Sequence, residues 1–192
     1  MLNRLHLFLV AAVAVRANPI APLAIDTFMG VSLRSGDANV HLREINANGN
    51  RFYVNKDSSA YCPPDISGLD CSEYGNNTVF AYNSEVQTLG LATTLPGGQQ
   101  IYVAADGALS YTVPHSAAIP ADALVRNFTY TPGPSENEVG NLKFQDAGFS
   151  ACPTSEMPIF QIFATNIAGY TRTDCTGINF GTTGSQPSAY QY

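Results

Sequence analysis

Short runs in which apolar and polar residues alternate recur along the whole chain. Side chains of an extended strand point alternately to two faces, so this period of two predicts half-buried β-strands. No long stretch carries a persuasive period of 3.6 residues, and the sequence contains neither a repeat nor a heptad. The expected strands cover residues 28–33, 39–45, 51–54, 78–82, 86–92, 100–105, 108–113, 124–130, 141–144 and 159–164.

Turn signals separate these runs and indicate antiparallel pairing. Asp106-Gly107 lies between two alternating runs, and Asn48-Gly49 follows another; such pairs tolerate the positive φ of tight hairpins. Many short strands at regular spacing predict one all-β, mostly antiparallel domain over residues 26–180. An antiparallel β-sandwich is the first expectation, and a closed β-barrel or a β-trefoil-like arrangement is the alternative. Residues 181–192 are polar and are expected to form a mobile tail.

The N-terminus has the pattern of a secretory signal peptide, expected to span residues 1–17. Arg4 supplies the positive end, and the apolar stretch that follows ends at Val15. This stretch is far shorter than the ~20 residues that a membrane-spanning helix needs, so no membrane span is expected. Cleavage at the end of the segment is the first choice and cleavage after Ala24 the second. Residues 18–25 contain proline and are expected to be flexible.

The net charge excludes several classes of partner. The formal charge is −6, and removal of Arg4 and Arg16 with the signal peptide makes it −8. An acidic chain with few lysines and arginines does not attract nucleic acid or anionic membranes. Charged residues are only 12% of the chain, so uncharged polar side chains supply much of the surface.

Four cysteines lie in the mature part of the chain, and an oxidising compartment favours disulfides. Three pairings are possible, and the shorter loops favour Cys62–Cys71 and Cys152–Cys175. Neither pair has the CxxC spacing of a zinc site, so no metal site is expected. Asn76-Asn77-Thr78 and Asn127-Phe128-Thr129 are N-glycosylation acceptors, so we expect glycans on Asn76 and Asn127.

Catalytic patterns are poor, and we expect neither a catalytic residue nor a cofactor. Two histidines remain after the signal peptide: His41, read as an outward strand residue, and His115, read as a solvated loop residue. No GxSxG elbow, HExxH motif or P-loop is present. A glycosidase would need two carboxylates on either side of a sugar bond. The candidate carboxylates fall mostly in expected turns, where turn chemistry alone accounts for them: Asp65, Asp70, Glu73, Glu85, Asp106 and Asp146.

Sugar binding without catalysis is the more plausible chemistry. Aromatic rings pack against the apolar faces of sugars, and the chain has 10 Tyr and 10 Phe but no Trp. Tyr102, Tyr111, Tyr130 and Tyr170 lie at or near expected strands. The alternative is that these tyrosines are half-buried packing residues with wet hydroxyl groups.

Several short motifs occur in an order that resembles the fungal cell wall protein PhiA family, which includes secreted proteins described as IgE-binding. The motifs are Phe28-Met29-Gly30-Val31, Gln100-Ile101-Tyr102-Val103, Leu142-x-Phe144-Gln145, Ala151-Cys152-Pro153 and Cys175-Thr176-Gly177-Ile178. The resemblance implies a secreted, non-enzymatic cell wall glycoprotein with a structural or wall-association role. Its partners would be wall polysaccharide or other wall components. The alternatives are a secreted polysaccharide-binding module, a secreted hydrolase with an unrecognised acidic site, and a secreted effector acting on a host.

Overall fold

The computed structural model describes residues 25–135 and 137–192, so the expected signal peptide and residues 18–24 lie outside the described part. The fold is built from β-strands and one short 3-10 helix, η1 (Cys71–Glu73). The strands are β1 (Ile25–Leu33), β2 (Arg43–Asn48), β3 (Arg51–Val54), β4 (Val79–Asn83), β5 (Thr88–Leu91), β6 (Gln99–Val103), β7 (Leu109–Tyr111), β8 (Phe128–Thr131), β9 (Gly140–Phe144), β10 (Phe149–Pro153), β11 (Phe160–Ala164) and β12 (Thr176–Thr183).

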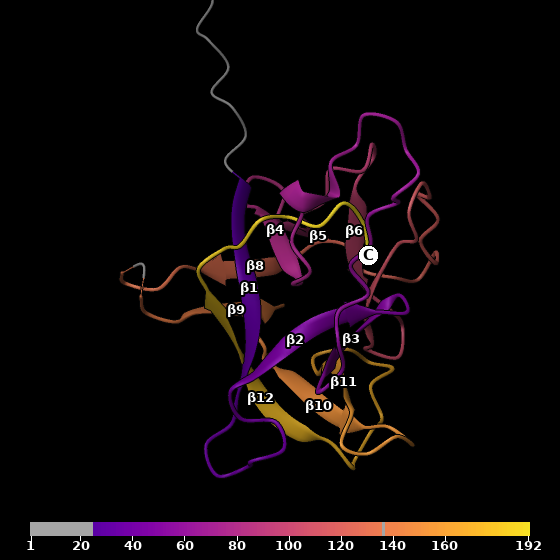
Figure 1. Cartoon of the computed structure of the whole chain (residues 1–192). Helices are drawn as coiled ribbons and strands as arrows, with labels where there is room; N and C mark the ends of the chain where they lie inside the picture. The colour runs from indigo at the N-terminus through magenta and orange to yellow at the C-terminus, as the bar shows by residue number, and fades with distance from the viewer. Residues whose placement is uncertain (1–24, 136) are drawn as a thin grey trace, which may run out of the picture.

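The strand pairings close into a barrel, in which each strand pairs with the next in antiparallel fashion. Nine strands form the ring, in the order β1–β4–β5–β6–β7–β3–β11–β10–β12 and back to β1. Strand β2 pairs with both β1 and β3, while β9 and β8 extend from β12 (Figure 1). Closure satisfies strand edges that an open sheet would leave unpaired. The all-β antiparallel expectation is confirmed, and its barrel alternative describes the fold better than the sandwich.

Tight hairpins form where the turn residues predict them. Strands β6 and β7 pair across the Asp106-Gly107 turn, where Gly107 has a φ of +90° and Asp106 Oδ1 accepts a hydrogen bond from the Ala108 backbone. Strands β2 and β3 pair across Gly49 and Asn50, both with positive φ, one residue later than the sequence indicates.

The expected strand at 39–45 is wrong in its first half. A turn occupies this region, held by Asp37: its carbonyl oxygen accepts a hydrogen bond from the His41 backbone and its carboxylate one from the Asn39 backbone. Val40 is buried, but Leu42 has a φ of 56° and is 67% exposed. The two apolar residues therefore do not share a face, and β2 begins after the turn.

The C-terminal third contains a strand that the sequence pattern did not separate, β10. It pairs with β11 on one edge and with β12 on the other. The turn that starts it is made by Gln145 and Asp146, both with positive φ. Because neither residue is the glycine or asparagine typical of this turn, the signal is weak.

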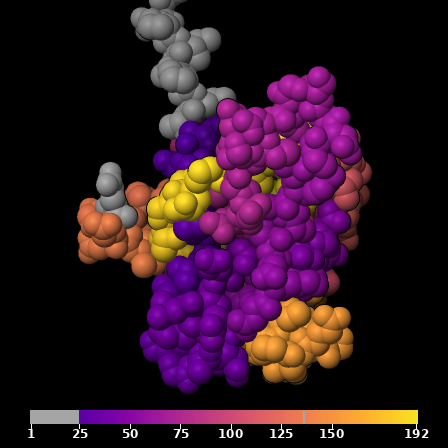
Figure 2. All heavy atoms as spheres, in the orientation of Figure 1, coloured from indigo at the N-terminus to yellow at the C-terminus, as the bar shows by residue number. Residues whose placement is uncertain are grey.

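The prediction of a mobile tail at 181–192 is wrong. The first three residues complete β12, and Gly181 and Thr182 are buried. The segment then crosses the surface between the N-terminal strand and the region around residue 75 (Figure 2). Tyr192 is 7% exposed, and its hydroxyl oxygen donates to Asn77 O at 2.7 Å and accepts from the Val79 backbone at 2.9 Å. These contacts anchor a segment whose polar composition predicts mobility.

Phenylalanines fill the centre of the barrel. Phe80 lies in the middle, with ring centroids 5.6 Å from Phe28, 5.3 Å from Phe52 and 5.4 Å from Phe180. A Cβ atom added to Gly30 would lie 2.7 Å from the ring of Phe180. Glycine at this position therefore makes room for the packed ring.

Candidate functional site

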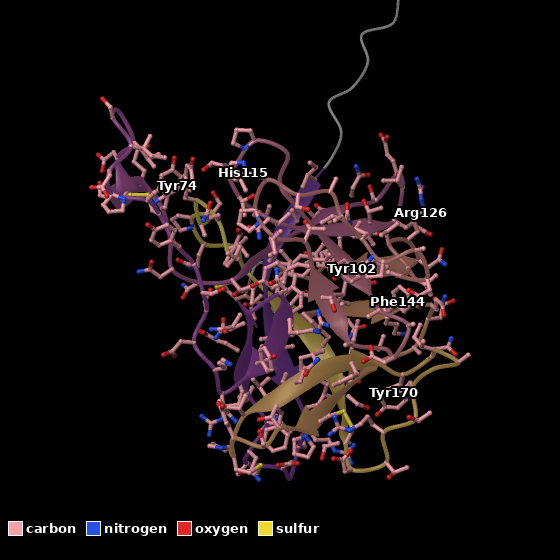
Figure 3. All side chains as sticks on the ribbon, turned by 90° about the vertical axis from the view of Figure 1, so that its right-hand side faces the viewer. Tyr74, Tyr102, His115, Arg126, Phe144 and Tyr170 are labelled. Carbon is pink, nitrogen blue, oxygen red and sulfur yellow. A yellow bond between two sulfur atoms is a disulfide. The ribbon has the colours of Figure 1, made fainter. Side chains whose placement is uncertain are left out.

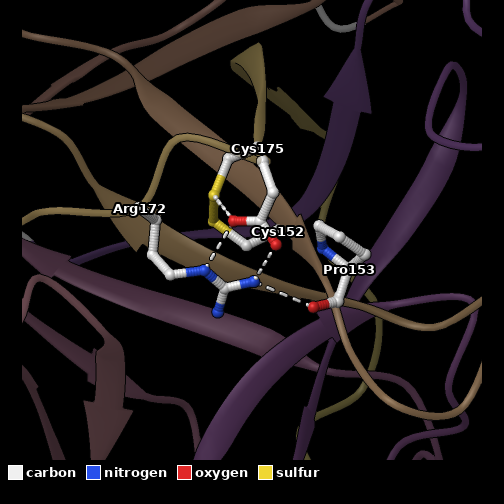
Figure 4. The surroundings of a disulfide bond; sticks show 5 residues. Cys152, Pro153, Arg172 and Cys175 are labelled. Carbon is white, nitrogen blue, oxygen red and sulfur yellow. Dashed lines mark hydrogen bonds and ion pairs between the residues drawn. A yellow bond between two sulfur atoms is a disulfide. The ribbon is translucent and has the colours of Figure 1, made fainter.

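The Cys152–Cys175 disulfide joins β10 to the residue before β12, with Cα atoms 4.1 Å apart. Arg172 lies beside it and pairs with Asp174 at 2.7 Å, while its Nη2 donates to Pro153 O at 3.0 Å (Figure 4). The hydrogen bond from Arg172 lowers the pKa of Asp174. The disulfide and the ion pair together fix the loop that leads into β12, which is a structural role.

The second disulfide, Cys62–Cys71, closes a surface loop with Cα atoms 5.8 Å apart. Asp70 precedes η1, and its carboxylate accepts hydrogen bonds from the backbone and the hydroxyl of Ser72. These hydrogen bonds lower the pKa of Asp70. The structure thus contains both cysteine pairs that the shorter loops favoured.

The two histidines lie in different surroundings. His41 is in the turn before β2 and not in a strand, and its Nδ1 accepts a hydrogen bond from the Arg34 backbone at 3.1 Å. His115 is exposed in the loop after β7 and has a φ of 59°, a conformation that costs a non-glycine residue energy (Figure 3). Within residues 25–135 and 137–192, no three His, Cys, Asp or Glu side chains come together in a way that could hold a metal.

The candidate carboxylates come from several separate turns. Glu85 lies between β4 and β5, Asp106 caps the β6–β7 hairpin, and Asp146 lies between β9 and β10. Asp65, Asp70 and Glu73 belong to the Cys62–Cys71 region. A glycosidase acid needs a raised pKa, whereas hydrogen bonds shift the pKa of Asp70 downward.

Two of the four candidate tyrosines are core residues. Tyr102 is 8% exposed and Tyr111 is 2% exposed. The hydroxyl of Tyr111 lies 3.3 Å from Ser59 Oγ. Burial raises the pKa of Tyr111. Tyr102 and Tyr111 are therefore packing residues, which is the alternative to sugar binding.

The other two tyrosines also pack against aromatic neighbours. Tyr130 stacks on Phe28, with ring centroids 4.5 Å apart, and burial raises its pKa. Tyr170 lies against Phe163 at 6.2 Å, next to the β6–β7 turn. The four tyrosines therefore do not form one flat surface for a sugar.

Both glycosylation acceptors are at the surface. Asn76 and Asn127 are exposed. Asn127 has a φ of 75° and lies just before β8, so it is outside the strand that was expected to contain it. The positions are accessible, and whether they carry glycans stays a prediction.

Three open clefts on the outer side of the barrel connect into one surface, which we call the outer trough. Their volumes are about 550, 250 and 470 Å³. Neighbouring clefts share lining residues: Gly97, Gly98 and Gln100 at one junction, and Ile25, Ala81 and Leu91 at the other. Sequence reasoning missed this surface, because its residues are simply the polar or small positions of alternating strands.

The chemistry of the outer trough is uncharged. Hydroxyl, amide and apolar side chains line it together with several glycines, and His115 is the one ionisable residue among the described residues of its lining. A separate cleft of about 710 Å³ lies near the ends of β10 to β12 and includes Arg34 and His41. In the described part of the chain, no helix has the length and apolar character needed to cross a membrane.

Comparisons with known proteins point to one family. Residues 28–192 match the family described as PhiA-like secreted protein. The chain is also similar to a protein of Arthroderma benhamiae described as an uncharacterized secreted protein. The two are 30% identical over 187 residues, which cover 92% of this chain and 91% of the relative. No solved structure matches the chain.

Proposed function

Because the chain belongs to the PhiA-like secreted protein family, we propose that it is a non-enzymatic protein of the fungal cell wall. The family and the secreted relative place it outside the cell. Its role in the wall would be structural or one of wall association, and glycans on Asn76 and Asn127 would make it a glycoprotein.

The observation that carries this proposal is the outer trough. A cell wall offers long polymers rich in hydroxyl groups, and a rigid sheet with hydroxyl and amide side chains can bind such polymers by hydrogen bonds. The trough is open; its floor lies on strands of the closed barrel, and loop residues line its two ends. A protein held on a wall polymer needs this kind of extended, preformed surface more than it needs a deep pocket.

The non-enzymatic part of the proposal rests on how the candidate side chains are used. Asp70 caps η1, Asp106 caps a hairpin and Asp174 pairs with Arg172. These carboxylates are committed to local structure, and their turns are separate along the chain. Catalysis on a sugar bond would instead require two carboxylates that converge on one cleft.

Purified mature protein incubated with fungal wall fractions tests the proposal. We expect the protein to sediment with the wall material and to release no new reducing ends during the incubation. A matched sample of denatured protein controls for trapping. Release of reducing sugar would replace the proposal with a secreted hydrolase, and a protein that stays in solution with every wall fraction would refute wall association.

A further inference from the structure

We propose that the outer trough binds an uncharged polysaccharide chain, which lies across strands β1, β4, β5 and β6. This inference rests on the proposed wall association and adds to it the binding surface and the class of ligand. It is carried by the register of the strands, the hydrogen-bonding groups, and the charge of the lining.

The floor of the trough is a row of four residues that face the same way, and three of them are small. Thr27 pairs with Ala81, Ala81 with Gly90, and Gly90 with Gln100, so the four lie side by side across four strands. Strands are ~4.8 Å apart, so the row is about 14 Å long. The opposite faces of the same strands carry buried core residues such as Phe80. The row is therefore a rigid, shallow floor backed by a packed core.

The Gln100 amide on this floor is held in place by hydrogen bonds but keeps a free acceptor. The Nε2 atom of Gln100 donates to Leu89 O at 2.7 Å and to Ile101 O at 2.9 Å, which holds the amide in place. Its Oε1 has no partner among the described residues and is available to accept from a sugar hydroxyl. A hydroxyl group of a sugar ligand would satisfy this oxygen.

The walls at one end of the floor are also preformed. Gly97 and Gly98 have positive φ and form a turn with open space above them, and His115 is held at a φ of 59° on the facing loop. At the other end, Ser185 and Ser188 of the anchored C-terminal segment contribute hydroxyl groups. Backbone hydrogen bonds from Gly98 to Leu95 O and from Gly75 to Ser188 O brace these two walls, so a ligand loses less free energy in ordering the site.

The lining distinguishes a neutral polymer from other partners. A polyanion would favour the cleft with Arg34, and a polycation would favour acidic side chains, which the described lining of the trough lacks. A peptide cannot add as a strand here, because β4 and β5 each have neighbours on both edges. Small side chains such as Ala81 and Gly90 also lack the large anchors of protein interfaces.

The test uses the purified mature protein in affinity gels that contain soluble β-1,3-glucan, with polygalacturonate and chitosan as charged polymers. We expect retardation by the neutral glucan. Ala81→Arg places a long charged side chain on the floor and should weaken that binding at least tenfold. Thr88→Arg, in the next row of the same trough, gives a second variant in case Ala81→Arg does not fold. Asn179→Arg adds the same charge in the cleft of Arg34 and serves as the matched control.

The results separate this inference from the wall-association proposal. Weaker glucan binding by the trough variants, with unchanged melting temperature and unchanged binding by Asn179→Arg, supports the trough. If the wild-type protein sediments with walls and both trough variants still bind glucan normally, the trough is not the binding surface. The proposed wall association would then stand without it. Preference for polygalacturonate or chitosan overturns the neutral ligand class. Failure of the wild-type protein to bind any wall fraction overturns the proposed function itself.

Discussion

Tyr192 shows how one residue can fix a segment that the sequence suggests is mobile. Its hydroxyl group accepts from the buried Val79 backbone and donates to Asn77 O, and its own backbone exchanges two hydrogen bonds with the Gln99 side chain. Such partners are costly to leave unpaired in a buried site. Tyr192→Phe should therefore lower the free energy of unfolding by about 1–3 kcal/mol near neutral pH.

The same hydroxyl group predicts a pH dependence. Burial raises the pKa of Tyr192 to about 12. The unfolded chain loses this proton from about pH 10 upward, while the folded chain keeps it. The contribution of the Tyr192 hydroxyl group to the free energy of unfolding is therefore fully present below about pH 10 and is lost as pH approaches about 12. The loss should be about 2–3 kcal/mol. Urea unfolding measured between pH 9 and 12 tests it. Tyr192→Phe should show a shallower fall than wild type, with the exposed Tyr61→Phe as control; equal slopes would contradict the assignment.

Gly30 gives a second prediction at this scale. Its missing side chain makes room for Phe180, and a Cβ atom would also lie 3.1 Å from Phe80. Gly30→Ala should overpack the core and cost about 1–3 kcal/mol of stability. Gly177→Ala is the control, because a Cβ there meets nothing within 4 Å. Thermal unfolding compares the two, and equal stability of both variants would show that the rings move aside freely.

At the scale of elements, the two disulfides should differ in what they stabilise. Cys152 is fully buried and ties β10 to the start of β12, whereas Cys62–Cys71 closes a surface loop. Cys152→Ser should cost about 2–5 kcal/mol and leave Cys175 as a free thiol. Cys71→Ser should cost less. Thiol titration, non-reducing peptide mapping and denaturant unfolding measure these effects, and a larger loss from Cys71→Ser would reverse the ranking.

Elements were predictable where turn chemistry and alternation agreed. Residues 51–54 and the hairpin around Asp106-Gly107 follow the sequence closely, because a turn signal fixes the phase of the alternation on both sides. The pattern misled at Leu42, where a non-glycine residue with positive φ breaks the alternation. It also gave no sign of β10, whose turn residues Gln145 and Asp146 are weak signals.

The candidate site was less predictable than the elements. Thr27, Ala81, Gly90 and Gln100 are unremarkable in the sequence, and they become one surface through cross-strand register. Register between distant strands depends on the closure of the whole barrel, which local patterns do not encode. The four candidate tyrosines do not form a sugar-binding surface. A high tyrosine content in the sequence does not distinguish packed rings from exposed ones.

At the scale of the whole molecule, both glycosylation acceptors are open to the solvent. Asn76 lies just before β4 and Asn127 just before β8. Enzymatic removal of N-glycans from the secreted protein should lower its mass, and Asn76→Gln with Asn127→Gln should abolish the shift. Each single variant reports the occupancy of the other position. An unchanged mass for the wild-type protein would show that neither acceptor is used.

The pairing of β1 with β12 also sets the order in which this molecule can assemble. The two strands are roughly 150 residues apart in the chain, so a high contact order makes their docking slow. Synthesis at ~5–20 residues per second leaves β1 without its partner for roughly eight to thirty seconds. During that interval both strands of the hairpins β2–β3 and β6–β7 are already synthesised and can pair. The edge of β1 that β12 covers stays exposed. A chaperone that binds extended segments in the secretory pathway would therefore meet this protein first at its N-terminal strand.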